Sequence, residues 1–198
     1  MLSRFTVLLA AASAALPASL AVAESPSSLP RISTITYSGN GCTRDPKLSG
    51  DFNDPTFSYN NFAASLPGTN QTLNCEVHIQ ATGASSGWQV ALKDNWVKGH
   101  LVLDPDTCLD YYTQVYFSQN AAKTGTARGR IRNTGDARTD QAVTLRSNLA
   151  GNQVWSPCTG SDGSPGILNV NFRGALSGDG KAYFEAFTEN WDLEWRRC

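Results

Sequence analysis

Two acidic residues near the end of the chain, Asp192 and Glu194, have the type and spacing of a glycosidase pair. Alternate residues of a strand share a face, with Cα atoms about 7 Å apart, and glycosidases use carboxylates about 5–9.5 Å apart. Glu185 and Glu189 could face this pair across a hairpin. Hydrolysis also needs one acid whose pKa is raised by burial. On a polar face beside Arg196 we expect ion-paired surface acids instead, and we assign no catalytic residue.

A serine within Gly83-Ala84-Ser85-Ser86-Gly87 fits the G-x-S-x-G pattern of a nucleophile elbow. That elbow lies between a strand and a helix and needs a histidine base. Here a tryptophan-containing strand follows, and nothing places His78 or His100, the two histidines of the chain, near Ser85. We therefore expect a hairpin turn.

Three arginines at alternate positions, Arg128, Arg130 and Arg132, are candidates for anion binding. On one face of a strand, their guanidinium groups could hold carboxylate, sulfate or phosphate groups of a polyanion. The alternative is an edge strand that is charged against edge-to-edge pairing. Asp136 and Asp140 lie close enough in sequence to neutralise the row.

Aromatic residues supply the second class of candidate, because a glycan site needs exposed rings. The candidates are Trp88, Trp96, Tyr111 and Tyr112, and the alternative for each is packing in the core. Asp104, Asp106 and Asp110 are grouped as in calcium sites, but the glycine and distal glutamate of an EF-hand are absent. We expect a turn there, and no metal or cofactor.

The first residues of the chain decide its compartment. Arg4, an apolar stretch over residues 5–16 and the small-x-small site Ala21-Val22-Ala23 predict a secretory signal peptide over residues 1–23. The stretch is too short to span a bilayer, which needs about 20 residues. We expect a secreted, extracellular protein with no membrane span, with a flexible lead-in over 24–30 and a single domain over 31–198. Its weakly negative charge gives no pull toward nucleic acid, and we expect a monomer.

Five cysteines fit this compartment, since disulfides persist outside the cytosol. Their spacing has no C-x-x-C motif and no clustered histidines, which argues against a zinc site. Four cysteines allow three pairings, and the sequence alone does not choose between them. The local settings favour Cys42–Cys75 and Cys158–Cys198, which leaves Cys108 as a buried thiol or an intermolecular bridge. Asn70 heads an N-glycosylation sequon, Asn70-Gln71-Thr72, in a turn-like segment.

The elements that must position these residues are strands. Short runs of period two alternate with Gly, Pro, Asn and Asp. They predict strands at 31–37, 56–63, 73–81, 88–104, 111–119, 126–133, 141–147, 167–176, 181–188 and 190–197, the fourth being one strand or two with a kink near Gly99. A helical turn or two is expected near DPKLSGDF or SNLAGNQ. About nine or ten strands predict an all-β antiparallel sandwich, with a barrel as the alternative. In the final strand, Trp191, Leu193 and Trp195 share a face that we expect to be buried.

Four segments resemble a family of small secreted proteins of fungi and some bacteria, the domain of unknown function DUF4360. They are ITYSGNGC (35–42), LNCEVHIQ (73–80), VWSPC (154–158) with GILNVNFR (166–173), and LEWRRC (193–198). The resemblance implies a secreted β-rich domain with two disulfides, and it implies no reaction. Cys108 and the arginine row depart from the family pattern.

The sequence therefore favours a non-enzymatic extracellular module that binds a glycan, a cell-wall component or a partner protein. One alternative is an extracellular hydrolase that uses Asp and Glu carboxylates. The other is a secreted effector or inhibitor, which would need a contiguous exposed apolar patch.

Overall fold

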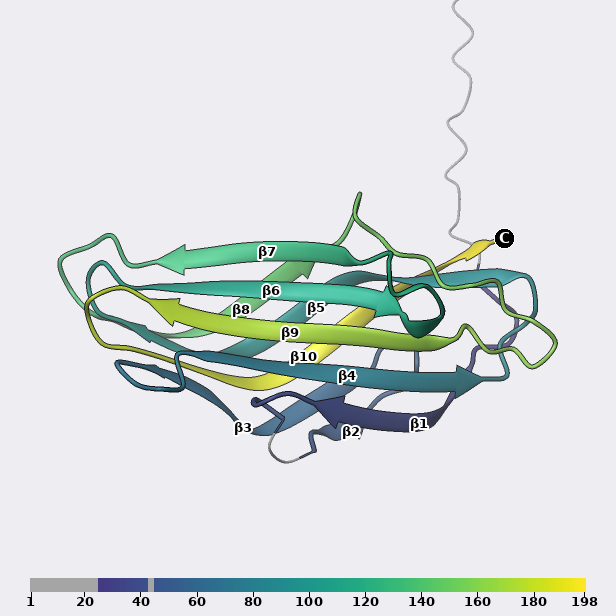
Figure 1. Cartoon of the computed structure of the whole chain (residues 1–198), viewed down its shortest axis with the longest axis horizontal. Coiled ribbons are helices and arrows are strands. Elements are labelled where there is room, and N and C mark those ends of the chain that lie inside the picture. The colour runs from purple at the N-terminus through teal and green to yellow at the C-terminus, as the bar shows by residue number, and fades with distance from the viewer. Residues whose placement is uncertain (1–24, 43–44) are drawn as a thin grey trace, which may run out of the picture.

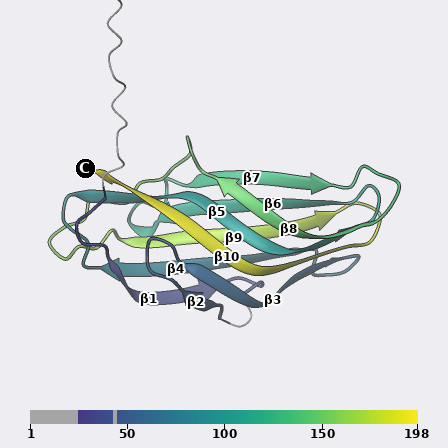
Figure 2. The same cartoon turned by 180° about the vertical axis from the view of Figure 1, so that it is seen from behind.

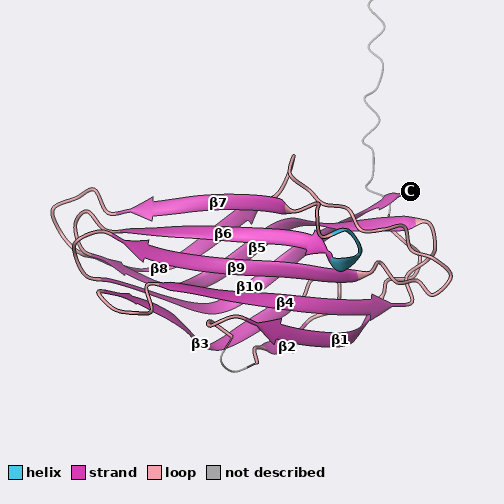
Figure 3. Cartoon of the chain, viewed as in Figure 1, coloured by secondary structure: helices cyan, strands magenta, loops and turns pink. Residues whose placement is uncertain are grey.

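The structure is a computed structural model that describes residues 25–42 and 45–198, so the signal peptide expected over residues 1–23 lies outside the described residues. The described residues form ten strands and one turn of 3-10 helix (Figures 1 and 3). The strands are β1 (Arg31–Ser38), β2 (Lys47–Ser49), β3 (Thr56–Leu66), β4 (Thr72–Thr82), β5 (Trp88–Leu103), β6 (Cys108–Phe117), β7 (Gly125–Arg132), β8 (Thr139–Asn148), β9 (Ile167–Ser177) and β10 (Ala182–Arg197), and the turn is η1 (Ser118–Asn120).

The strands form two five-stranded antiparallel sheets packed face to face. We call β1-β4-β9-β6-β7 the front sheet and β2-β3-β10-β5-β8 the back sheet. The front sheet lies nearer the viewer in Figure 1, and the back sheet does so in Figure 2. This confirms the all-β sandwich predicted from the sequence and excludes the closed barrel.

Alternating side chains explain why these segments form strands. In β4, Leu73, Cys75, Val77, Ile79 and Ala81 are all buried, and the residues between them face outward. Burial of one face of a strand fixes its register, because a slip by one residue would expose the whole apolar set.

Aromatic rings fill the space between the two sheets. Phe62 of the back sheet lies with its ring centroid 5.6 Å from that of Phe172 of the front sheet. Trp191 is fully buried, with its ring centroid 4.7 Å from that of Phe57. Phe184 completes the group, so the rings of β3, β9 and β10 hold the two layers together.

The end of the chain differs from the prediction of two strands. Residues 182–197 form one 16-residue strand, β10, whose register shifts between Ala186 and Thr188. A β-bulge leaves one residue unpaired and reverses the alternation beyond it. Phe184 and Ala186 face inward before the bulge, and Glu189 and Trp191 face inward after it. The expected hairpin that would set Glu185 and Glu189 against Asp192 and Glu194 is therefore wrong.

The helical turns are also in different places from those predicted. DPKLSGDF contains the short strand β2, because Leu48 pairs with Phe57 and packs against the core. SNLAGNQ contains the end of β8. Among the described residues the helical turn is η1, directly after β6. In that part of the chain no helix is long and apolar enough to cross a membrane.

Two disulfides tie loops to the sheets. Cys42–Cys75 joins the loop after β1 to β4, and Cys158–Cys198 joins the loop after β8 to the last residue. These are the two pairs that the local settings in the sequence favoured. Cys108 is buried and unpaired, with its Sγ 3.0 Å from the Ser177 hydroxyl.

Removing the second disulfide should destabilise the protein. The Cys158–Cys198 bond closes a loop of 40 residues, which is worth about 3–4 kcal/mol in the chain-entropy account. We expect the double variant Cys158→Ser/Cys198→Ser to lose that amount of unfolding free energy in urea denaturation. Cys108→Ser, the control, should lose no more than about 1 kcal/mol. Equal losses in the two variants would contradict this assignment.

Candidate functional site

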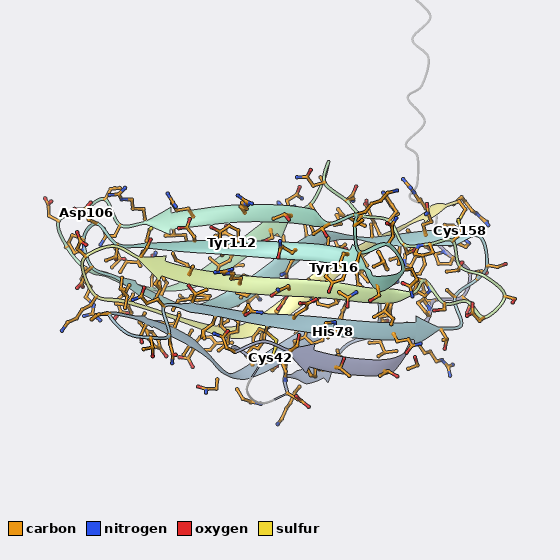
Figure 4. The ribbon with its side chains drawn as sticks, in the orientation of Figure 1. Cys42, His78, Asp106, Tyr112, Tyr116 and Cys158 are labelled. Carbon is orange, nitrogen blue, oxygen red and sulfur yellow. A yellow bond between two sulfur atoms is a disulfide. The ribbon has the colours of Figure 1, made fainter. Side chains whose placement is uncertain are left out.

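The outer face of the front sheet brings together residues that are distant in sequence. Tyr112 of β6 pairs with Arg128 of β7 on one side and with Arg173 of β9 on the other. Their inward neighbours Thr113 and Phe172 are fully buried, so this register row points outward. Figure 4 shows Tyr112 on this face, in line with Tyr116.

A hollow lies around this row. It has a volume of about 280 Å³, and its lining residues are Tyr112, Gln114, Thr126, Arg128, Arg173 and Ala175. We call it the Tyr112 hollow. The Arg128 guanidinium lies 5.5 Å from the centroid of the Tyr112 ring, within the range of a cation–π contact. The ring therefore borders the hollow with a cation beside it.

The two arginines of this hollow differ from the other arginines nearby. Arg130 makes two hydrogen bonds to Asp110, of 2.6 and 2.8 Å, and Arg132 donates one of 3.1 Å to Asp106. In the described part of the chain, neither Arg128 nor Arg173 forms an ion pair. The row of three arginines predicted to bind an anion together is thus divided. Two are neutralised, and Arg128 is joined instead by Arg173.

Asp140, one of the two aspartates close enough in sequence to neutralise that row, has a different partner. Asp140 approaches His100 on the back sheet, with an Oδ1–Nε2 distance of 2.9 Å. The acids that neutralise Arg130 and Arg132 are Asp110 on the adjacent strand and Asp106 in the turn before it. Cross-strand pairing, rather than closeness in sequence, selects the partners.

A second set of polar residues continues the outer face of the front sheet. Tyr116, Asn169 and His78 lie in one register row across β6, β9 and β4. His78 Nδ1 lies 2.6 Å from Asn169 Oδ1, and Tyr116 donates a hydrogen bond of 2.6 Å to Glu76. That hydrogen bond, together with burial and the carboxylate charge, raises the pKa of Tyr116 to about 12. These groups satisfy one another and form a fixed polar surface beside the Tyr112 hollow (Figure 4).

The four aromatic candidates do not gather at one place. Trp88 is only 2% exposed and has Arg197 over its ring, so it presents no open face. Tyr111 points inward from β6 and packs against the core. Its ring lies so close to Gly129 of β7 that a side chain there would collide with it. Trp96 is half-buried on the outer face of the back sheet. Of the four, Tyr112 alone lines the hollow of the front sheet.

A glycosidase needs an acid whose pKa is raised by burial, and in this structure that acid is Glu189 rather than one of the outward-facing pair Asp192 and Glu194. Glu189 is fully buried between the sheets. Its carboxylate accepts hydrogen bonds from the Tyr59 hydroxyl, Trp191 Nε1 and Asn95 Nδ2. Burial raises the pKa of Glu189, and the three donors only partly offset it. The closed setting makes Glu189 part of the core.

The remaining acidic candidates have structural partners. Asp192 forms an ion pair with Lys93 at 3.2 Å, whereas Glu194 accepts a hydrogen bond from the Gln153 side chain and forms no ion pair in the described residues. Asp104 accepts a hydrogen bond from the Lys181 backbone N–H, while Asp106 and Asp110 bind different arginines. In the described residues no group of three His, Cys, Asp or Glu side chains could hold a metal ion.

The loop of Ser85 joins β4 of the front sheet to β5 of the back sheet, so the hairpin turn expected there is wrong. The Ser85 hydroxyl lies 3.0 Å from the Ser27 hydroxyl and accepts a hydrogen bond from the Ser28 backbone N–H. Asn70 is exposed in the loop between β3 and β4, and its glycosylation stays a prediction.

The model of DUF4360, a domain of unknown function, matches residues 29–198. The chain belongs to the DUF4360 family. None of the curated proteins matches this DUF4360 chain. Among solved structures, TmCBM61 in complex with beta-1,4-galactotriose is similar over 85% of this chain and 91% of its own, with 10% identity and a TM-score of 0.31. A likeness at this level does not extend to the site of the DUF4360 domain.

Arg173 is the residue of the site that sequence reasoning missed. The alternation of ILNVNFRGAL places Arg173 on the polar face of its strand, so its outward direction could have been predicted. Its role depends on β9 lying beside β6, and nothing in the sequence of either strand gives that pairing.

Glu189 should give the unfolding free energy a pH dependence of definite sign. Because its pKa is raised in the folded protein, its proton stabilises the fold fully below the unfolded pKa of about 4.3. That contribution is lost as the pH rises through the folded pKa. We expect the unfolding free energy of Glu189→Gln, measured by urea denaturation at each pH, to fall less between pH 4 and pH 7 than that of the wild type.

Two further variants control this experiment. Glu189→Ala should cost about 3 kcal/mol or more, because it leaves buried donors without an acceptor. Asp192→Asn, which changes an acid on the surface, should keep the pH dependence of the wild type. A Glu189→Gln variant with the same pH dependence as the wild type would show that this carboxyl is not the source.

Proposed function

We propose that this protein is a secreted, non-enzymatic binding domain that holds acidic polysaccharide in the Tyr112 hollow. The observation that carries the proposal is the pair of exposed arginines, Arg128 and Arg173, that flank one tyrosine ring without a carboxylate partner in the described part of the chain.

Electrostatics favour an anion between the two arginines. Their strands are separated only by β6, so their backbones lie about 10 Å apart, and both side chains line the same hollow. Like charges on one hollow repel, and an anion relieves that repulsion. A guanidinium group donates two parallel hydrogen bonds to a carboxylate or sulfate, so each arginine can hold an acidic group of a uronate or a sulfated sugar.

The remaining lining residues fit the rest of a sugar. Tyr112 offers a ring against which the apolar face of a pyranose can pack. Gln114 and Thr126 add amide and hydroxyl groups that can bond to sugar hydroxyls. The row of Tyr116, Asn169 and His78 extends the polar surface, which suits a chain better than a single small anion.

The other two functions considered from the sequence have less support. In the described residues the exposed large hydrophobic side chains are Leu29 and Phe187, which do not make the contiguous apolar patch that an effector or inhibitor would need. For the hydrolase, the acid with the raised pKa, Glu189, is enclosed in the core, and no carboxylate lines the Tyr112 hollow.

The proposal predicts charge-dependent binding. We expect the protein to bind polygalacturonate and dextran sulfate by isothermal titration calorimetry at low ionic strength, with affinity that falls as salt screens the charges. Arg128→Gln and Arg173→Gln should each lower the affinity about fivefold to tenfold, as expected for loss of one charge-assisted contact. Tyr112→Ala should weaken binding to a similar extent.

The controls separate this site from general attraction. The double variant Arg130→Gln/Asp110→Asn removes an ion pair and leaves the local net charge unchanged, so it should keep the affinity within about twofold. Binding to uncharged dextran, at whatever level, should not change in Arg128→Gln. No binding to either acidic polymer, or equal losses from Arg128→Gln and from the double variant Arg130→Gln/Asp110→Asn, would contradict the proposal. The two polymers distinguish carboxylate from sulfate as the preferred group.

A further inference from the structure

The outer face of the back sheet carries a second hollow. Its volume is about 580 Å³, and its lining residues are Thr56, Trp96, Lys98, Thr144, Thr188 and Asn190. We call it the Trp96 hollow. Trp96 of β5 lies between Arg146 of β8 and Asn190 of β10. Lys98, the next residue of β5 on the same face, lies between Thr144 of β8 and Thr188 of β10.

Trp96 is held in position by a chain of polar contacts. The Arg146 guanidinium lies 4.7 Å from the centroid of its ring. Arg146 in turn makes two hydrogen bonds to Asp94, of 2.7 and 3.0 Å, and Asn148 donates a third of 2.8 Å. Asp94 is only 2% exposed. A buried acid thus fixes a surface arginine against an indole ring.

The charge on Asp94 is maintained despite its burial. Desolvation raises the pKa of this carboxyl, but the hydrogen bonds from Arg146 and Asn148 outweigh it and the pKa is lowered. Burying an ionised carboxylate is costly unless it is paired. Its full pairing here restrains Arg146, and a restrained support is what a preorganised binding ring requires.

The polar side of the hollow is also fixed. The Asn190 side-chain amide donates to Asp54 Oδ1 at 2.6 Å and to Thr56 Oγ1 at 3.0 Å, so its orientation is set. Three threonine hydroxyls and the exposed Lys98 side chain also line the hollow, and no carboxylate does. An indole ring with hydroxyl and amide groups around it matches the mixed apolar and hydroxylated surface of a sugar ring.

The two hollows lie on the outer faces of the two sheets, and one contact joins residues next to them. Tyr111, the neighbour of Tyr112, points inward, and its hydroxyl donates to the backbone carbonyl of Arg146 at 3.4 Å. At each hollow, an arginine of the edge strand lies over the aromatic ring that lines it, although Arg146 itself does not line the Trp96 hollow. The front face is seen in Figure 1 and the back face in Figure 2.

We infer that the Trp96 hollow is a second saccharide site, which takes a hydroxylated sugar ring against the Trp96 indole, on the face opposite the Tyr112 hollow. The inference depends on the residues of the back sheet and does not need the Tyr112 hollow to be correct. If both sites are present, one molecule holds two polysaccharide chains on opposite sides.

The test is a binding panel of neutral polysaccharides on the full secreted protein. Laminarin, xylan, galactomannan and chitohexaose are the probes, and calorimetry is the measurement. We expect at least one to bind, and Trp96→Ala to lower that affinity about tenfold or more, the size of loss typical of a tryptophan at the centre of a site. Tyr112→Ala should leave the same affinity within about twofold.

Further variants guard against loss of folding in Trp96→Ala. Thr144→Val and Thr188→Val keep the side-chain shape and remove one hydroxyl each, and each should lower the affinity about threefold. Thr34→Val, an exposed threonine on the front sheet, is the matched control and should bind as the wild type.

Three outcomes would overturn the inference. They are the absence of binding to every neutral probe, binding that Trp96→Ala and the two threonine variants leave intact, and binding that Tyr112→Ala abolishes equally. None of these outcomes bears on the acidic polymers, so failure at the Trp96 hollow is distinguishable from failure of the proposed function at the Tyr112 hollow.

Discussion

Cross-strand register is the constraint on which both candidate sites depend. Burial of one face of each strand leaves alternate residues outward, and antiparallel pairing then sets outward residues of adjacent strands side by side. Arg128, Tyr112 and Arg173 form one such row on the front sheet, and Arg146, Trp96 and Asn190 form another on the back sheet. Each row collects residues from three strands, so no short segment of the chain contains a site.

The core that fixes this register contains a buried acid, Glu189. The bulge at Phe187 reverses the alternation of β10, which brings Trp191 into the core and takes Glu189 in with it. The Tyr59 hydroxyl, the Trp191 indole and the Asn95 amide satisfy the carboxylate. Without these donors a buried acid would be costly. The bulge and the hydrogen-bond network around Glu189 are therefore linked. The last strand pairs with β3 from Ala182 to Asn190 and with β5 as far as Arg197.

The sequence was sufficient for the fold class and for most inward-facing residues, because alternation is a local signal. The inward set of β4 and the inward face of Trp191 and Leu193 were readable in this way. The pairing order of the strands was not, since each strand is compatible with several neighbours. For that reason Arg128 could be proposed, while its partner Arg173 and the separate neutralisation of Arg130 by Asp110 could not. Likewise, Tyr111 and Tyr112 are adjacent in sequence, and alternation alone does not say which of the two enters the core.

The most direct test of the account is a two-dimensional ¹H–¹⁵N NMR titration of the protein with oligogalacturonate. We predict the largest shift changes at the backbone amides of Tyr112 and at the side-chain Nε–H groups of Arg128 and Arg173, which lie in one row on three strands. Unchanged spectra, or changes confined to Arg130, Arg132 and the loops, would contradict the conclusion that register builds the binding site of this protein.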